Sequence, residues 1–339
     1  MKALQYQDIH QVGLADVPEP ELQAGEALIE IDYAGICGTD MAIWAGKHPR
    51  AKAPLTLGHE ISGRIVSLQD PPGSSTLKEG SFVTINPLIS CGNCWSCREG
   101  LEHICYQLRL FGIDAPGGMA NYLKVPLSNV HALPAGLDPA KAALTEPLAV
   151  GIHAVNLGNP NAHDKVLVIG AGPIGLINAL CLRRKGVSHL LISDVCDYRL
   201  ELARKLGFET VDGRTVDLKK HIHEWTEGVG VDAVYEVSGH PSAMDGITDL
   251  VRCRGLIMMV RVHKDACPVD LRSINFKEIT ILGSRCYQDT EFAEAIEALP
   301  DLPAEALISH RMPLAEGPEG FQAMLDPNLS CKVLFEAHS

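Results

Sequence analysis

Two different patterns of apolar and polar positions divide this chain. Up to about residue 150, short β-like runs such as "EALIEIDYAGIC" (26–37), "ISGRIVSL" (61–68) and "ANYLKVP" (120–126) are separated by Gly and Pro. From about residue 164 apolar strands alternate with amphipathic helices, beginning with "KVLVIG" and "PIGLINALCLRRKG". The first pattern predicts an irregular all-β domain, and the second predicts a parallel sheet with helices on its faces.

Length and charge narrow the possible functions. The 339 residues suit two domains, and the net charge of -13 argues against nucleic-acid binding, which needs Lys and Arg to displace counterions. We therefore expect a small-molecule partner. The N-terminus lacks the apolar core of a signal peptide, and glycines interrupt the longest apolar run, Val166 to Leu182, which favours a buried strand and helix over a membrane span. These features predict a cytoplasmic protein, in which clustered cysteines more often bind metal than form disulfides.

A glycine-rich turn joins the first strand and the first helix of the alternating half. Gly170, Gly172 and Gly175 in "VLVIGAGPIG" follow a predicted strand and open a predicted helix. Such glycines allow a tight turn, close approach of the backbone to a pyrophosphate and close packing of helix on strand, while the helix N-terminus attracts phosphate. The turn predicts a dinucleotide site, and an ordinary glycine turn beside a helix cap is the structural alternative.

The residue that ends the next strand bears on the choice of cofactor. Asp194 ends "HLLISD", 19 residues after Gly175, where a carboxylate accepts hydrogen bonds from both ribose hydroxyls and repels a 2'-phosphate. This favours NAD, whereas Arg199 leaves NADP open because guanidinium pairs with phosphate. We also expect cofactor contacts from Pro173 and Ile174 in the first helical turn, and from Val260 and Ser284 after later strands.

Three short motifs supply groups that bind metals. Taken singly, a cysteine after a strand is most often a small buried hydrophobe, and an acid in the first turn of a helix favours the dipole. Together, a thiolate, an imidazole and carboxylates match the ligands of zinc, and a catalytic zinc site leaves one position for water or substrate. The candidates are Cys37, Thr39 and Asp40 in "AGICGTDM", His59 and Glu60 in "LGHEISG", and Glu146 in "LTEPLAVG".

Four further cysteines lie within fifteen residues, in "CGNCWSCREGLEHIC". An iron–sulfur site of the bacterial ferredoxin kind needs a spacing of three and then Cys-Pro, but seven residues separate Cys97 from Cys105 and Tyr106 follows. A redox pair would need a thioredoxin-like βαβ setting, which this β-rich half does not offer. Four thiolates satisfy zinc with no open position, as in structural sites, so we expect Cys91, Cys94, Cys97 and Cys105 to bind a structural zinc.

The series of motifs resembles the zinc-dependent medium-chain alcohol dehydrogenases, specifically the branch of sorbitol (polyol) and threonine dehydrogenases. The resemblance runs through "GICGTD", "LGHE", the four-cysteine stretch, "GGMANYLKVP", "EPLAVGIHA", "VLVIGAGPIGL" and "KVLF". It implies an α/β protein with a GroES-like irregular β catalytic domain at 1–150 and 293–339, and a Rossmann doubly wound parallel-sheet domain at 151–292. It also implies a homo-oligomer, a dimer or tetramer, paired through the edge strand in "ITILGSR".

The same resemblance implies two zinc ions per subunit and a role for each candidate. Oxidation of a secondary hydroxyl to a ketone, with hydride transfer to C4 of the nicotinamide, is the implied reaction. By this resemblance Cys37 and His59 bind the catalytic zinc, and Glu60 completes the ligand set. Glu146 lies near the zinc or its water. Thr39 is expected to hydrogen-bond the substrate hydroxyl, and Asp40 is expected to orient His59.

The substrate is the part that the sequence specifies least. The loop "WAGKHPRAKAPLTLGHE" has four basic residues, including His48, Arg50 and Lys52, which either hold a carboxylate or phosphate or form a solvated face. Trp44 is either a wall of the substrate site or a core residue, and Arg261 either contacts cofactor or substrate or lies on the surface. A polyol, an aldonate, a sugar phosphate and threonine all stay open, as does a catalytically silent NAD-binding zinc sensor.

Overall fold

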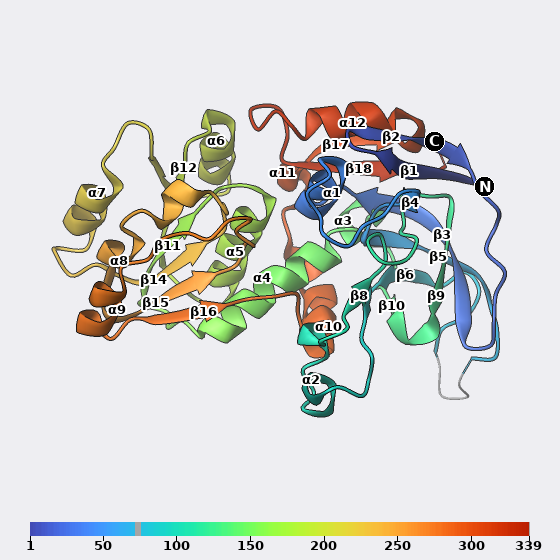
Figure 1. Cartoon of the computed structure of the whole chain (residues 1–339), viewed down its shortest axis with the longest axis horizontal. Helices are drawn as coiled ribbons and strands as arrows, with labels where there is room; N and C mark the ends of the chain where they lie inside the picture. The colour runs from blue at the N-terminus through green and yellow to red at the C-terminus, as the bar shows by residue number, and fades with distance from the viewer. Residues whose placement is uncertain (72–75, 339) are drawn as a thin grey trace. The chain divides into compact units, whose positions relative to one another are not determined.

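The computed structural model describes residues 1–71 and 76–338 and divides into two compact units (Figure 1). The first unit comprises Met1–Ala149 and Gln288–Ser339, and the second comprises Val150–Tyr287. The boundary between Tyr287 and Gln288 precedes α10 (Asp289–Ala298), so this whole helix belongs to the first unit. The sequence had placed residues 288–292 with the nucleotide-binding half. The other boundary falls within α4 (Thr145–Gly158).

The first unit is built on a seven-stranded sheet whose central strand is β3 (Glu26–Gly35). Apolar side chains alternate along β3, so that Ala27, Ile29 and Ile31 are fully buried, as expected of a strand with one face on the core. The strand order is β10 (Val130–Ala132), β6 (Phe82–Ile85), β5 (Glu60–Leu68), β3, β18 (Lys332–Glu336) and β17 (Ile308–Pro313), with β9 (Tyr122–Pro126) also pairing with β3.

This sheet brings together distant parts of the sequence. Strands β5 and β18 flank β3 on opposite sides, both antiparallel to it, so Gly35 pairs with Glu60 on one side and with Leu334 on the other. The smaller elements are β2 (Gln11–Asp16), β1 (Lys2–Asp8) and β4 (Leu55–Thr56) in a three-stranded sheet, the pair β7 (Leu88–Ile89) and β8 (Arg109–Leu110), and the helices α1 (Gly38–Trp44), α2 (Trp95–Arg98), α3 (Pro139–Ala142), α11 (Ala304–Leu307) and α12 (Gly317–Ala323).

The second unit has a six-stranded, entirely parallel sheet, which confirms the expected strand–helix alternation. The strand order is β13 (Glu209–Asp212), β12 (His189–Asp194), β11 (Lys165–Ile169), β14 (Val231–Glu236), β15 (Val251–Met259) and β16 (Thr280–Gly283). Its helices are α5 (Pro173–Arg184), α6 (Asp197–Lys205), α7 (Leu218–Trp225), α8 (Ile247–Leu250) and α9 (Leu271–Lys277).

The order of these strands places the glycine-rich turn. Successive strands run outward from β11 in one direction to β13, and β14 to β16 follow on its other side, so the strand order reverses at β11. In open parallel sheets, ligands bind beyond the carboxyl ends of the strands at such a reversal. The turn after Ile169 lies at this point. Within the described residues no helix is long and apolar enough to cross a membrane.

Candidate active site and metal centres

Cys37 opens helix α1 as its N-cap. Its backbone is extended (φ -97°, ψ 160°), its Sγ accepts the Thr39 N–H at 3.5 Å, and its own N–H donates to Asp40 Oδ2 at 2.8 Å. These reciprocal bonds form a capping box, which fixes the direction of the thiol by local hydrogen bonding. The Thr39 hydroxyl oxygen lies 3.8 Å from the same sulfur. The motif "CGTD" thus places a thiol and a hydroxyl side by side.

His59 precedes strand β5 and lies beside Asp40 in the interior of the first unit. Its Nδ1 is 3.8 Å from Asp40 Oδ1, both side chains are almost completely buried, and neither atom has a hydrogen-bond partner. Gly58, the residue before it, has a φ of +96° that suits glycine, and a Cβ there would lie 2.7 Å from Met119 Cγ. Asp40 and His59 are therefore in close contact, but the distance between these two atoms is too long for a hydrogen bond.

The electrostatics of these residues link them into one cluster. Burial alone would lower the pKa of His59, but the charge of Asp40, together with Cys37 and Glu146, raises it well above its usual value. A hydrogen bond with Cys37 acts in the same direction. Burial raises the pKa of Asp40 in spite of the neighbouring imidazole. Cys37, His59 and Glu146 thus lie close enough to influence one another.

Glu60 is held by a lysine that the sequence did not predict at this site. Both oxygens of its fully buried carboxylate accept hydrogen bonds from Lys332 Nζ, at 2.6 and 2.7 Å, and the same ammonium donates to the Ile36 carbonyl at 3.1 Å. A Cβ at Gly35 would lie 2.2 Å from Glu60 Oε2, so only glycine leaves room for this carboxylate. Glu60 can bind a metal only by giving up part of its contact with Lys332.

The charges around Lys332 confirm that it belongs to the cluster. Burial would lower the pKa of this ammonium, yet Glu60 first, and then Cys37 and Glu146, raise it. The donor set of the cluster is therefore a thiol, an imidazole and two carboxylates, which is the chemistry that zinc accepts. The unpartnered Nδ1 of His59 and its buried neighbour Asp40 fit an imidazole whose other nitrogen serves a metal.

The four cysteines near residue 100 lie much closer together. Adjacent sulfurs are 3.4 to 3.9 Å apart, between Cys91 and Cys105, Cys94 and Cys97, Cys94 and Cys105, and Cys91 and Cys97. Among the described residues, no other group of three or more His, Cys, Asp or Glu side chains has all its ligand atoms within 4.8 Å of one another. Backbone N–H groups of Cys97 and Tyr106 lower the pKa of Cys94 to about 6, so this thiol is ionised at neutral pH. The arrangement suits a closed zinc site.

In the second unit the glycine-rich turn has the geometry that its sequence predicts. Gly170 has a φ of +108°, and a Cβ at Gly175 would lie 1.8 Å from the Gly170 carbonyl oxygen. The Ala171 N–H donates to Asp194 Oδ2 at 2.6 Å, and Oδ1 accepts the N–H groups of Val195 and Cys196. Asp194 therefore also braces the loop that leads into α6, so the structural and the ribose-binding interpretations are compatible.

Two polar atoms that follow the carboxyl ends of the parallel strands are buried without hydrogen-bond partners. The Nε of Arg199 and the Oγ of Ser284 make no hydrogen bond, and the Arg199 guanidinium lies 3.7 Å from the Cβ position of Gly172. Ser284 follows β16, and its N–H donates to Met259 at the end of β15. Val260 follows β15 and donates to Glu236. The unsatisfied Arg199 nitrogen beside the glycine turn fits a phosphate-bearing ligand.

Sequence reasoning missed Glu236, which organises the carboxyl end of β14. Its fully buried carboxylate accepts hydrogen bonds from the Ser238 and Gly239 N–H groups and contacts His263 Nε2 at 2.8 Å. The side chain of exposed Arg261 packs against Gly239, whose Cβ position is 2.8 Å from Arg261 Cγ. Arg261 thus packs on the turn after β14. The "YEVSGH" motif was the available signal.

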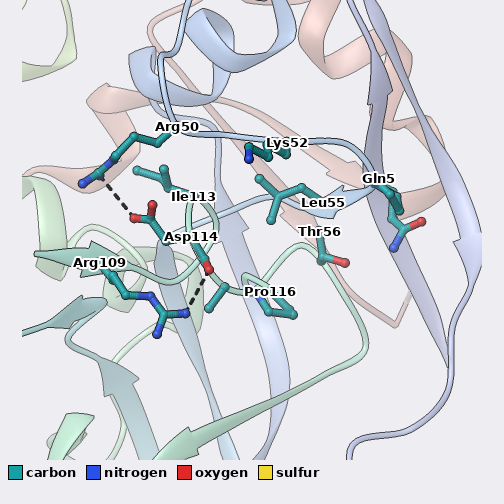
Figure 2. Close-up of a pocket in the computed structure, with 11 residues that line it drawn as sticks. Gln5, Arg50, Lys52, Leu55, Thr56, Arg109, Ile113, Asp114 and Pro116 are labelled. Carbon is teal, nitrogen blue, oxygen red and sulfur yellow. Dashed lines mark hydrogen bonds and ion pairs between the residues drawn. The ribbon is translucent and has the colours of Figure 1, made fainter. Parts of the chain in front are cut away.

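The remaining substrate candidates have distinct surroundings. Trp44 is 5% exposed and packs edge-on against His10, with ring centroids 4.4 Å apart, as a core residue does. His48 Nδ1 accepts the N–H groups of Arg50 and Ala51, which shapes the basic loop. Arg50 reaches Asp114 and lines a pocket on the first unit (Figure 2).

Comparison with known proteins matches both halves of the chain. Residues 23–135 match the alcohol dehydrogenase GroES-like domain, and residues 173–301 match the zinc-binding dehydrogenase domain. The chain is 37% identical over 319 residues to 2-dehydro-3-deoxy-L-galactonate 5-dehydrogenase of Pseudoalteromonas atlantica, covering 90% of this chain and 93% of that protein. The chain belongs to the zinc-dependent medium-chain alcohol dehydrogenase family.

Other members of the family extend the comparison. L-threonine 3-dehydrogenase of Bacillus licheniformis is 32% identical over 318 residues, covering 91% of this chain and 90% of that protein. An alcohol dehydrogenase of Escherichia coli CFT073 complexed with NADH superposes with a TM-score of 0.92 at 28% identity, with 99% of each chain covered. A zinc-binding dehydrogenase of Sinorhizobium meliloti bound to NADP gives 0.92 at 29% identity, covering 99% and 98%. The family therefore includes both dinucleotides.

Removing one cysteine from each metal centre of this dehydrogenase should separate stability from turnover. Cys94→Ser should lower the melting temperature and the zinc content by about one ion per chain, because a closed site contributes folding energy. Cys37→Ser should abolish turnover while leaving dinucleotide binding intact. Thermal unfolding, metal analysis and fluorescence titration with NADH measure these effects. Unchanged melting of Cys94→Ser, or unchanged turnover of Cys37→Ser, contradicts the division.

Breaking the Glu60–Lys332 pair should destabilise the first unit. Lys332→Met leaves a buried carboxylate without its cation, which typically costs about 3–5 kcal/mol. Adding Glu60→Gln should recover part of that loss because the uncompensated charge is removed, and urea unfolding of the wild type, both single variants and the double variant gives the coupling energy. Additive losses would show that the two side chains do not depend on one another.

Proposed function

We propose that this dehydrogenase uses zinc and NAD to oxidise a secondary hydroxyl of a polyol or sugar acid to the ketone. The observation that carries the proposal is the buried cluster of Cys37, His59 and two glutamates in the first unit, in a chain whose second unit has an intact dinucleotide turn. Relatives named as sugar-acid dehydrogenases support the substrate class, among them the Pseudoalteromonas protein.

The residues of the cluster divide the tasks that this oxidation requires. Cys37 and His59, with Glu146 or Glu60, would hold the metal, which when bound supplies Lewis-acid polarisation of the substrate oxygen. Asp40 lies beside Nδ1 of His59, which favours a ring orientation that leaves the other ring nitrogen free to bind the metal. Lys332 donates hydrogen bonds to both oxygens of the Glu60 carboxylate within this buried site.

Oxidation of a secondary alcohol releases a hydride and a proton, and the two leave by different routes. A nicotinamide held by the second unit would supply the acceptor for the hydride. The hydroxyl proton needs a carrier, and Thr39 Oγ1, which lies 3.8 Å from the Cys37 sulfur, is a hydroxyl placed at the cluster to take this role. A hydroxyl can accept that proton while donating its own toward solvent, so no charge accumulates on Thr39.

NAD rather than NADP is the cofactor we propose. Asp194 lies at the end of β12, beside the turn that would approach the pyrophosphate, and its negative charge opposes a 2'-phosphate. Arg199 lies across the same turn and would pair with phosphate oxygens. Because the family includes proteins that bind NADH and proteins that bind NADP, membership alone does not select the cofactor. The negative charge of Asp194 is what favours NAD. We also propose a cytoplasmic location, because clustered cysteines suited to metal binding are typical of a reducing compartment.

A substrate screen tests the proposal directly. The zinc-loaded protein should reduce NAD faster than NADP with at least one polyol, aldonate, sugar phosphate or threonine, followed by absorbance of the reduced nicotinamide. Cys37→Ser is the control for activity from contaminating enzymes. Failure of the wild-type protein on every class, with NAD still bound, would favour the silent sensor.

We also propose that subunits pair through the edge strand β16. This strand ends the sheet of the second unit, and Ile281 on it is 39% exposed. Light scattering should give a mass of two or four chains for the wild type and a smaller assembly for Ile281→Lys. Val229→Lys, at a residue 63% exposed and away from the edge strand, is the matched control. A monomeric wild type contradicts the pairing.

A further inference from the structure

A pocket of about 540 Å³ opens on the first unit, beside the basic loop (Figure 2). Three segments form it: Gln5 of β1, residues 50–56 and residues 109–116. The volume falls within the range of small-molecule sites, roughly 300–1,000 Å³. Its lining contains three basic side chains and one acidic side chain, Arg50, Lys52, Arg109 and Asp114.

Most of the positive charge in this pocket is not neutralised. Arg50 is the cation paired with Asp114, at 3.2 Å, and it also donates to the Leu108 carbonyl at 2.7 Å. Arg109 donates to the backbone carbonyl of Asp114 at 3.1 Å, a contact that leaves its charge in place. Within the described part of the chain, the Lys52 ammonium has no ion pair or hydrogen bond. Three cations against one anion give an excess of two positive charges, in a chain of net charge -13.

The walls that carry these charges are held in place. Asp114 Oδ2 accepts the Leu110 N–H at 3.0 Å, and Gly112 donates to the Ala115 carbonyl at 2.8 Å, which closes a tight turn. Arg50 and Arg109 reach this turn from two sides (Figure 2). A Cβ at Gly117 would lie 2.3 Å from the Gly58 carbonyl oxygen, so the turn packs directly on the segment before His59. Charges on a fixed frame bind a small anion with little loss of conformational entropy.

One segment joins the pocket to the candidate metal site. Leu55 and Thr56 of β4 line the pocket, and the chain continues from them through Gly58 to His59. The turn that carries Asp114 is bonded to the same segment, because the Gly117 and Gly118 N–H groups donate to the carbonyls of Thr56 and Gly58, each at 2.9 Å. The pocket wall and His59 thus belong to one hydrogen-bonded framework.

We propose that the pocket binds the oxyanion end of the substrate, a carboxylate or a phosphate, while the hydroxyl to be oxidised lies at the metal cluster. This inference rests on the proposed function and adds the side chains that select an anionic substrate, Lys52 and Arg109. A neutral polyol would leave two cations of the pocket uncompensated and would gain nothing from them.

Kinetics on matched substrates test the assignment. D-gluconate and sorbitol 6-phosphate carry an anion, and sorbitol does not. Lys52→Gln and Arg109→Gln should each lower kcat/KM for the anionic substrate at least fivefold, mainly through KM, because the lost contact is made equally in the ground and transition states. Turnover of sorbitol should not change. Lys47→Gln removes the same charge from the same loop outside the pocket lining and should leave all three substrates unaffected.

The two anionic probes distinguish the source of the oxyanion. Dependence on Lys52 and Arg109 with gluconate alone identifies a carboxylate, and dependence with the phosphate ester alone identifies a phosphate. The pocket assignment is overturned if Lys52→Gln and Arg109→Gln change kcat/KM no more for the anionic substrates than for sorbitol, or no more than Lys47→Gln does. The dehydrogenase activity would stand in that case.

Calorimetric binding separates the pocket from the reaction. Titration of the zinc-loaded protein with gluconate and with inorganic phosphate, without NAD, should show binding that Lys52→Gln and Arg109→Gln weaken at least fivefold. If this holds and no substrate is oxidised, the pocket stands and the proposed activity fails. If neither anion binds and no anionic substrate responds to the variants, the pocket proposal is overturned.

Discussion

The buried ion pair between Glu60 and Lys332 is the constraint on which the candidate active site depends. Strand β18, at the end of the chain, pairs with β3 and carries Lys332 to a carboxylate at the start of β5. Gly35 on β3 leaves the space that this carboxylate fills. A charged contact thus lies beside the apolar core of the first unit, and His59 directly precedes the strand that carries Glu60.

The two candidate metal centres follow opposite physical rules. The four cysteines come from one short stretch, and their sulfurs need no other part of the fold to converge. The catalytic candidates come from an N-cap, a strand start and a helix start, so their spacing depends on the whole first unit. A closed local site stabilises a lobe, whereas donors from separate elements leave space for a substrate. On that difference rests our proposal that the looser set of donors, and not the denser one, carries the chemistry.

Local patterns explain what could be predicted from the sequence. The strand, glycine turn and helix around Gly170 are contiguous, so their spacing alone specified the Rossmann half, and the fold class is confirmed. The partner of Glu60 lies 272 residues away, and no periodicity connects such a pair. Glu236 was missed for a similar reason, because its partner His263 follows a different strand. The basic loop was recognised, but the single carboxylate of Asp114 in its pocket depends on tertiary packing.

Charge balance explains why a lysine that cannot bind a metal sits in the catalytic cluster. Four groups able to carry negative charge surround His59: Cys37, Asp40, Glu60 and Glu146. Burial of so many like charges is costly, and the raised pKa of Asp40 reflects part of that cost. Lys332 offsets one charge, and a divalent cation would offset two more, so metal binding stabilises the groups that hold it. An apolar residue at position 332 would instead leave Glu60 to compete for the metal at every stage of the reaction.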